Sequence, residues 1–130
     1  MKKVIANIII PSDVDRLPEL HEIDIAWILA KHFNCEVVFL RRLQGFKRKT
    51  PDIQMMGVLW EIKSPIGKSK NTVRHQIERA VKQSKNLIID NRRSKISDKI
   101  FNKQIQKEFD ERHFIKRIIV IDKSENVLVF

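Results

Sequence analysis

The sequence predicts one α/β domain over residues 1–130, with a mixed central β-sheet flanked by helices. A chain of 130 residues, 42% hydrophobic and 32% charged, has the length and composition of a single globular domain with a real core. Short β-branched and aromatic runs alternate in part with longer stretches of helical periodicity. Because three predicted strands follow one another without a helix between them, a mixed sheet is favoured over a purely parallel one.

The N-terminal part is expected to form a strand, a helix and a second strand. The apolar run from Ala6 to Ile10 predicts a buried strand that ends at Pro11. Pro18 fits an early helical position and Asn34 is a typical terminator, which predicts a helix between them. The run from Glu36 to Leu40 is short, β-branched and aromatic, so it is predicted to be a strand.

A basic loop over Arg41 to Thr50 leads into a predicted β-hairpin. The two arms, Asp52 to Met55 and Val58 to Ser64, flank the joint Met56-Gly57. Short apolar runs around a two-residue joint that contains glycine are typical of a hairpin.

The C-terminal half is expected to hold two helices and three strands. They are a helix over Asn71 to Ser84, a strand over Leu87 to Asp90, a helix over Ser97 to Arg112, and a closing hairpin of Arg117 to Ile121 with Val127 to Phe130. Both helices carry an apolar stripe at helical spacing. The predicted order of elements is therefore β-α-β-β-β-α-β-α-β-β.

Charge and cysteine content narrow the function classes. The net charge of +10 and the pI of about 10 point to a polyanionic partner such as nucleic acid, with a solvated basic surface as the alternative. The single cysteine, Cys35, is predicted to be a buried core thiol, and it rules out an internal disulfide. No apolar run approaches the length of a membrane span, so a cytoplasmic location and no membrane partner are expected.

The chemistry is concentrated in the predicted hairpin. Glu61 and Lys63 alternate along one strand and therefore share a face, while Asp52 in the other arm can bring its carboxylate close to Glu61. Neighbouring carboxylates repel unless a cation neutralises them, and hard divalent cations such as Mg²⁺ prefer oxygen ligands. The pattern predicts a metal-dependent site in which Lys63 stabilises charge on a phosphate or orients the attacking water. The alternative is an exposed ion pair on a surface hairpin, worth little energetically.

A third acid, Glu22, lines up with the apolar Ala26 and Leu29 on the first predicted helix. A carboxylate on an apolar stripe is unusual without a partner, so Glu22 is a candidate for the same site. The alternative is an ordinary acid at a helix start, and Glu19 competes more weakly for the catalytic role.

Basic and amide side chains after the hairpin form a predicted nucleic-acid-binding surface. Its members are Ser64, Lys68, Lys70, Arg74, Lys82 and Gln83. A Ser/Lys-rich loop can contact phosphates through lysines and backbone N–H groups, although a solvated linker has the same composition. The pairs and runs Lys47-Arg48-Lys49 and Arg92-Arg93 are taken as surface charges that jointly extend the phosphate track. The histidines show no metal-binding spacing, and no nucleotide-binding glycine loop or serine-hydrolase motif is present.

Two resemblances connect these residues to known families. Pro51-Asp52 followed by Glu61-Ile62-Lys63, with an acidic helix upstream, resembles the PD-(D/E)XK nuclease superfamily, whose restriction-endonuclease-like core has the order αβββαβ. A resemblance covering most of the chain is to the C-terminal nuclease domain of contact-dependent growth inhibition toxins, relatives of which cleave transfer RNA. It rests on His21-Glu22-Ile23, Thr50-Pro51-Asp52, Trp60-Glu61-Ile62-Lys63-Ser64-Pro65, Gly67-Lys68, Lys82-Gln83-Ser84-Lys85-Asn86 and Ile89-Asp90.

The resemblance implies a metal-dependent endonuclease that hydrolyses phosphodiester bonds, with RNA, and tRNA in particular, as its substrate. It implies catalytic residues Glu22, Asp52, Glu61 and Lys63, metal contacts at Asp52, Glu61 and Ile62, and an assisting role for Gln83. Mg²⁺ is the expected metal, with Mn²⁺ or Zn²⁺ as alternatives.

The biological setting stays open at this stage. As a toxin, the chain would be delivered into the cytoplasm of a target bacterium and would have an immunity protein as its partner. The start at Met1 without a delivery region keeps a chromosomal or mobile-element nuclease as an alternative. A homodimer is compatible with the superfamily. A DNA endonuclease of the same fold and a non-catalytic nucleic-acid-binding module are the competing functions.

Overall fold

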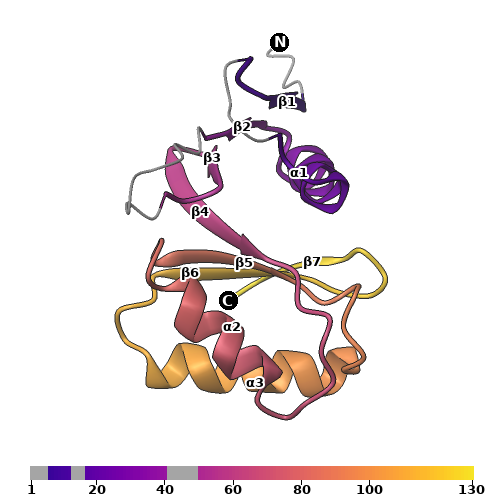
Figure 1. The fold of residues 1–130 in the computed structure, drawn as a ribbon, viewed down its shortest axis with the longest axis vertical. Helices are drawn as coiled ribbons and strands as arrows, with labels where there is room; N and C mark the ends of the chain where they lie inside the picture. Colours follow the sequence, from indigo (N-terminus) through magenta and orange to yellow (C-terminus); the bar gives the residue numbers. More distant parts are fainter. Residues whose placement is uncertain (1–5, 13–16, 41–49) are drawn as a thin grey trace. The chain divides into compact units, whose positions relative to one another are not determined.

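The computed structural model describes residues 6–12, 17–40 and 50–130 of the chain (Figure 1). Arg41 to Lys49, which make up nearly all of the predicted basic loop and include the run Lys47-Arg48-Lys49, lie outside the described residues. The predicted order of helices and strands is confirmed. The elements group into two compact units, Met1–Trp60 and Glu61–Phe130, and the boundary between them falls inside strand β4. The expectation of a single domain stays a prediction.

The first unit combines one helix with strands of both directions. Its elements are β1 (Asn7–Ile9), α1 (Leu20–Phe33), β2 (Glu36–Phe39), β3 (Ile53–Met55) and the beginning of β4 (Val58–Lys63). Strand β1 pairs in parallel with β2, whereas β2 with β3 and β3 with β4 are antiparallel. Helix α1 packs beside β1 and β2 (Figure 1).

The prediction that the first strand is buried is wrong. Strand β1 pairs only with β2 among the described strands, and Ile9 and Ile10 are 39% and 37% exposed. An apolar run has the same appearance in an edge strand as in a central one, so its pattern could not reveal this exposure. Cys35, just before β2, is likewise only partly buried rather than enclosed in a core.

Local signals at both ends define helix α1. Glu19 is its N-cap and forms a capping box with Glu22, while Pro18 precedes the helix instead of lying within it. At the other end Asn34 adopts the left-handed conformation with φ of 50°, and the backbone N–H of this residue donates to Ala30. The predicted terminator is confirmed. Asparagine suits this position because it tolerates the left-handed conformation better than most residues.

The predicted hairpin is also confirmed. Strands β3 and β4 are joined by Met56 and Gly57, whose φ angles of 53° and 73° are both positive. Two consecutive left-handed residues match the twist of the flanking strands, as in a type I′ turn. Gly57 adopts this backbone without steric cost, whereas Met56 accepts some strain.

The second unit has two helices against one face of its strands (Figure 1). Its elements are the remainder of β4, α2 (Thr72–Ala80), β5 (Asn86–Asp90), α3 (Asp98–Glu111), β6 (Arg117–Ile121) and β7 (Val127–Val129). Strands β4, β5 and β6 run parallel, and β7 closes the unit antiparallel to β6. Hydrogen-bonded neighbours follow chain order from β1 to β7, so the predicted mixed sheet is confirmed.

The core of the second unit lies between its strands and these helices. It is formed by Val73, Ile77, Ala80, Leu87, Ile89, Ile96, Phe101, Ile105, Ile115, Ile118 and Val120. Each fully buried valine, leucine, isoleucine or phenylalanine side chain in this core contributes about 1.5–3 kcal/mol of transfer free energy. Leu87 and Ile89 pair with Glu61 and Lys63 in the parallel ladder, so the charged face of β4 is also the face that the helices cover.

Helix α2 is shorter than predicted. It ends at Ala80, and the chain continues to Ser84 through a tightened turn in which Lys82 and Gln83 donate to carbonyls three residues earlier. Such i→i−3 bonds satisfy the last carbonyls of a helix. Helix α3 matches its prediction, with Ser97 as N-cap accepting from the N–H of Ile100.

Candidate active site on strand β4

The predicted pair of Glu61 and Lys63 is a buried ion pair. Lys63 Nζ lies 3.4 Å from Glu61 Oε2, and the side chains are 23% and 3% exposed, respectively. Both residues extend from the face of β4 that α2 and α3 cover, as the alternation of side chains predicts. The alternative of an exposed pair on a surface hairpin is therefore wrong, because this carboxylate is enclosed.

Gln83 joins this pair from the turn after α2. With its amide oriented to satisfy both groups, its nitrogen donates to Glu61 Oε1 at 2.8 Å and also contacts Oε2. A buried carboxylate is costly unless its oxygens are hydrogen-bonded. Lys63 and Gln83 thus hold the Glu61 carboxylate in one orientation, and three predicted site residues meet in the second unit.

Asp52 is held in the first unit, immediately before β3. Its backbone N–H donates to Trp60 at 2.9 Å, its carbonyl accepts from Leu40 at 3.0 Å, and the residue is 8% exposed. The last pair of the hairpin ladder joins Ile53 to Trp60. Asp52 immediately precedes β3, and Glu61 is the first residue of the part of β4 that belongs to the second unit.

Glu22 has a structural role in the same unit. It is 7% exposed, and its Oε1 accepts the backbone N–H of Glu19 at 3.0 Å in the capping box of α1. This bond corresponds to the alternative reading of Glu22 as a helix-start acid. Its catalytic role stays a prediction.

The predicted metal contacts consist of oxygen donors alone. Asp52 and Glu61 offer carboxylates, and the buried, 6% exposed Ile62 offers only a main-chain carbonyl. Such a set suits a hard cation that keeps several waters, and it lacks the imidazole or thiolate ligands typical of zinc. Within the described ranges, no three histidine, cysteine or acidic side chains gather into a metal-holding group.

Among the predicted nucleic-acid contacts, Ser64 is engaged in an internal network. Its hydroxyl donates to Asp90 at 3.3 Å, and the fully buried Asp90 also accepts from Arg92 through Nε at 2.9 Å and Nη2 at 3.1 Å. Arg92 in turn contacts Glu125 at 3.3 Å. The prediction that Arg92 is a surface charge is wrong, because its guanidinium compensates a buried carboxylate; Arg93 is exposed as predicted.

Arg74 and Lys82 are exposed, as a nucleic-acid contact requires. Arg74 also lies 3.8 Å from Glu78, four residues further along α2. An ion pair this exposed is weak and leaves the guanidinium available to a phosphate.

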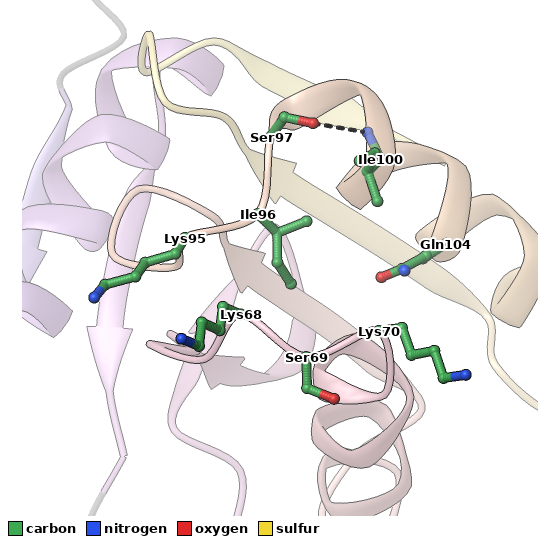
Figure 2. A pocket seen from close by; sticks show the side chains of 8 residues that line it. All are labelled: Lys68, Ser69, Lys70, Lys95, Ile96, Ser97, Ile100 and Gln104. Carbon is green, nitrogen blue, oxygen red and sulfur yellow. Dashed lines mark hydrogen bonds between the residues drawn. The ribbon is translucent and has the colours of Figure 1, made fainter.

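Lys68 and Lys70 border an open hollow of about 400 Å³ in the second unit (Figure 2). The other lining residues, which the sequence pattern did not single out, are Ser69, Lys95, Ile96, Ser97, Ile100 and Gln104. The position of Lys95 just before the N-cap of α3 could have marked it as a candidate. No local sequence pattern indicates that the segment around Lys95 contacts the loop around Lys68.

Comparison with known proteins identifies the family. Residues 49–127, which are more than half of the chain, match the family model described as the contact-dependent growth inhibition CdiA C-terminal domain. The chain belongs to this family. It is therefore one of the toxin domains of contact-dependent growth inhibition, and the predicted resemblance to these toxins is confirmed.

A solved structure related to this family has the same fold. The CdiA-CT/CdiI toxin and immunity complex from Burkholderia pseudomallei contains a chain that matches with a TM-score of 0.69 and 21% identity, over 93% of this chain and 97% of that chain. At this level of identity the likeness shows the fold alone. No curated protein matches the sequence. Within the described part of the chain, no helix is long and apolar enough to cross a membrane.

Proposed function

We propose that this chain is a toxin nuclease that hydrolyses phosphodiester bonds of RNA, with tRNA as its substrate. The observation that carries the proposal is the buried Glu61 carboxylate, held by Lys63 at 3.4 Å and by the amide of Gln83. A buried ion pair adds little net stability because desolvation offsets its attraction, and buried, oriented charges are concentrated at catalytic sites.

The order of elements supports a PD-(D/E)XK core. From α1 to β5 the chain runs α-β-β-β-α-β, which is the order of that core. Asp52 and the Glu61–Lys63 pair occupy adjacent arms of the β3–β4 hairpin, as the superfamily motif requires. These two features support our proposal of a PD-(D/E)XK core.

In the proposed mechanism the side chains of β4 bind and orient the scissile phosphate. Asp52 and Glu61, with the carbonyl of Ile62, would hold a divalent cation, most suitably Mg²⁺, which when bound supplies Lewis acidity and lowers the pKa of water. Lys63 places its ammonium beside the phosphate and offsets the negative charge that grows as water attacks. Gln83 keeps the Glu61 carboxylate from rotating. Glu22 of α1 is the fourth residue that we propose for the catalytic set.

The proposed substrate follows from charge and shape. The net charge of +10 favours a polyanion. Folded RNA presents both a distinctive shape and unpaired nucleotides, which supports it as the substrate. Ser64, Lys68, Lys70, Arg74 and Lys82 are the proposed phosphate contacts.

Membership of the toxin family also suggests the biological setting. The structural neighbour is a toxin and immunity complex. We therefore propose that this domain is delivered into a target cell and that a cognate immunity protein neutralises it in the cell that produces it.

A cleavage panel tests the proposal. Purified protein is incubated with total tRNA, plasmid and single-stranded DNA in Mg²⁺, Mn²⁺ or EDTA, alongside Asp52→Asn and Lys63→Met. Asp110→Asn, on the exposed face of α3, is the charge-matched control for Asp52→Asn. Cutting of tRNA that requires metal, survives in the control and disappears in both site variants supports the proposal. If only DNA is cut, the protein is a DNA nuclease and the proposed RNA substrate is wrong. If nucleic acid is bound in a salt-sensitive manner but no substrate is cut, the protein is a binding module and not an enzyme.

A further inference from the structure

The hollow of about 400 Å³ in the second unit is built from two loops and one helix. The loop before α2 contributes Lys68, Ser69 and Lys70, and the segment leading into α3 contributes Lys95 to Ser97. The backbone N–H of Lys95 donates to Gly67 at 3.0 Å, which ties the two loops together. This bond holds the two loops side by side where they border the hollow.

Charge and apolar surface are separated within the hollow. In Figure 2 the side chains of Ile96, Ile100 and Gln104 turn toward its middle, while the ammonium groups of Lys68 and Lys70 extend to opposite sides. Lys95 extends to the same side as Lys68 in this view. The interior is thus mostly aliphatic with one amide, and the positive charges lie around the rim.

The amide of Gln104 supplies a second, independent observation. Its Oε1 is shielded from solvent, yet no described residue donates a hydrogen bond to it. A shielded acceptor without a donor destabilises the fold, and a ligand carrying an N–H group would satisfy it. Gln104 lines the hollow from α3, so a rotation of its side chain toward the hollow would present this oxygen to such a donor.

These features distinguish a nucleotide from a bare anion. A free phosphate or an acidic side chain would gain nothing from the aliphatic surface of Ile100, which is 53% exposed. A nucleobase offers flat apolar faces to the isoleucines and ring or exocyclic N–H groups to the amide oxygen. The phosphates on either side of that base would then meet lysines on opposite sides of the rim.

We propose that the hollow receives one unstacked nucleotide of the RNA substrate, with its base inside and its flanking phosphates on Lys68, Lys70 and Lys95. This inference rests on the proposed function, because it assigns the hollow to the same nucleic acid. It adds a recognition site on α3 for a single-stranded or looped segment, which is the form in which RNA exposes its bases.

Binding measurements with matched variants test the hollow. Fluorescence anisotropy in EDTA follows the full-length protein with three labelled octamers: oligo(rA), oligo(rC) and an abasic ribose-phosphate octamer. Gln104→Met removes the amide and keeps the length of the side chain; Gln106→Met, on the exposed face of the same helix, is its control. Lys68→Gln with Lys95→Gln is compared with Lys99→Gln plus Lys103→Gln, which removes the same charge from exposed positions outside the hollow.

The nucleotide proposal makes three quantitative expectations. The wild type binds the base-bearing octamers about tenfold more tightly than the abasic one, in line with the contribution of one bound base. Gln104→Met loses about fivefold in affinity for the base-bearing octamers only, as for one hydrogen bond. The Lys68/Lys95 variant lowers the salt dependence, d log K/d log[salt], by about 1.4 relative to its control, since each single-strand phosphate contact contributes about 0.7.

The outcomes separate the hollow from the active site. Equal affinity for abasic and base-bearing octamers means that phosphate alone is bound, and it overturns the proposal. Gln104→Met and the Lys68/Lys95 variant behaving like their controls, while tRNA cleavage persists, also overturns it without touching the nuclease assignment. If instead the wild type binds the base-bearing octamers more tightly but cleaves no tRNA, the nuclease proposal fails and the nucleotide-binding proposal stands.

Discussion

The Glu61–Lys63 pair makes a specific prediction about the balance between stability and function. At 3.4 Å and an effective dielectric constant of about 20, the gross Coulomb attraction is about 5 kcal/mol. Burying the two charges costs several kcal/mol, and Glu61 is the more enclosed partner with 3% exposure. The two effects nearly cancel. We expect Glu61→Gln, which removes the charge and keeps the shape, to change the free energy of unfolding by less than about 1 kcal/mol.

Removing only the positive partner should be far more damaging. Lys63→Met leaves the Glu61 carboxylate buried with Gln83 as a remaining partner, and we expect a loss of about 2 kcal/mol. This value is below the 3–5 kcal/mol typical of fully buried pairs because Lys63 is 23% exposed. In the double variant no uncompensated charge remains. Its stability should therefore recover most of what Lys63→Met loses, giving a coupling energy of about 1–2 kcal/mol.

Urea unfolding followed by far-UV circular dichroism measures all four proteins, with the slope m checked for constancy. The reasoning is refuted if Glu61→Gln destabilises the protein as strongly as Lys63→Met, or if the two effects are additive in the double variant. Either result would make the pair an ordinary stabilising contact rather than a charge retained for function.

Three further predictions concern local features. Ser97→Ala should cost about 1 kcal/mol of unfolding free energy, because the side chain of Ser97 caps α3 by accepting from the N–H of Ile100; thermal unfolding beside the exposed Ser124→Ala measures it. Gly67→Ala should lower stability by about 1 kcal/mol and weaken RNA binding, because a Cβ would lie 2.7 Å from Thr72 Oγ1 and displace the loop of the hollow; unchanged RNA affinity would contradict this. Burial raises the pKa of the Cys35 thiol. The increase of its alkylation rate with pH should therefore occur at a higher pH than in a free cysteine peptide. Because the folded-state pKa is the higher one, any stability from this thiol is present below the unfolded pKa and falls as pH rises; an alkylation profile that coincides with the peptide's would contradict the burial.

Local signals in the sequence predicted the elements, and nonlocal contacts account for what they missed. The turn at Met56-Gly57 and the terminator Asn34 were predictable because each requires a left-handed backbone that few residues adopt. The exposure of β1 was not, since an apolar run carries no information about whether a strand has neighbours on both sides. The length of α2 was overestimated because its last turn tightens without a change in composition.

The candidate site shows the same division. Alternation along β4 placed Glu61 and Lys63 on one face, and their contact is confirmed. Gln83 was identified from its resemblance, but its hydrogen bonds to Glu61 depend on how the turn after α2 meets β4, which no local pattern encodes. The pairing of Arg92 with the buried Asp90 was missed, although their separation by two residues at a strand end was a usable signal. The hollow around Gln104 required the meeting of two loops far apart in sequence.

The most direct test of the central claim is the rate of tRNA cleavage by Glu61→Gln compared with the wild type, in Mg²⁺ and at a temperature where both proteins are folded. A metal-bound carboxylate that acts in the transition state should be worth at least about 100-fold, so we predict a loss of that size or more with the free energy of unfolding nearly unchanged. Glu78→Gln, an exposed acid on α2, should cleave at the wild-type rate. If Glu61→Gln cleaves as fast as the wild type, β4 does not carry the active site.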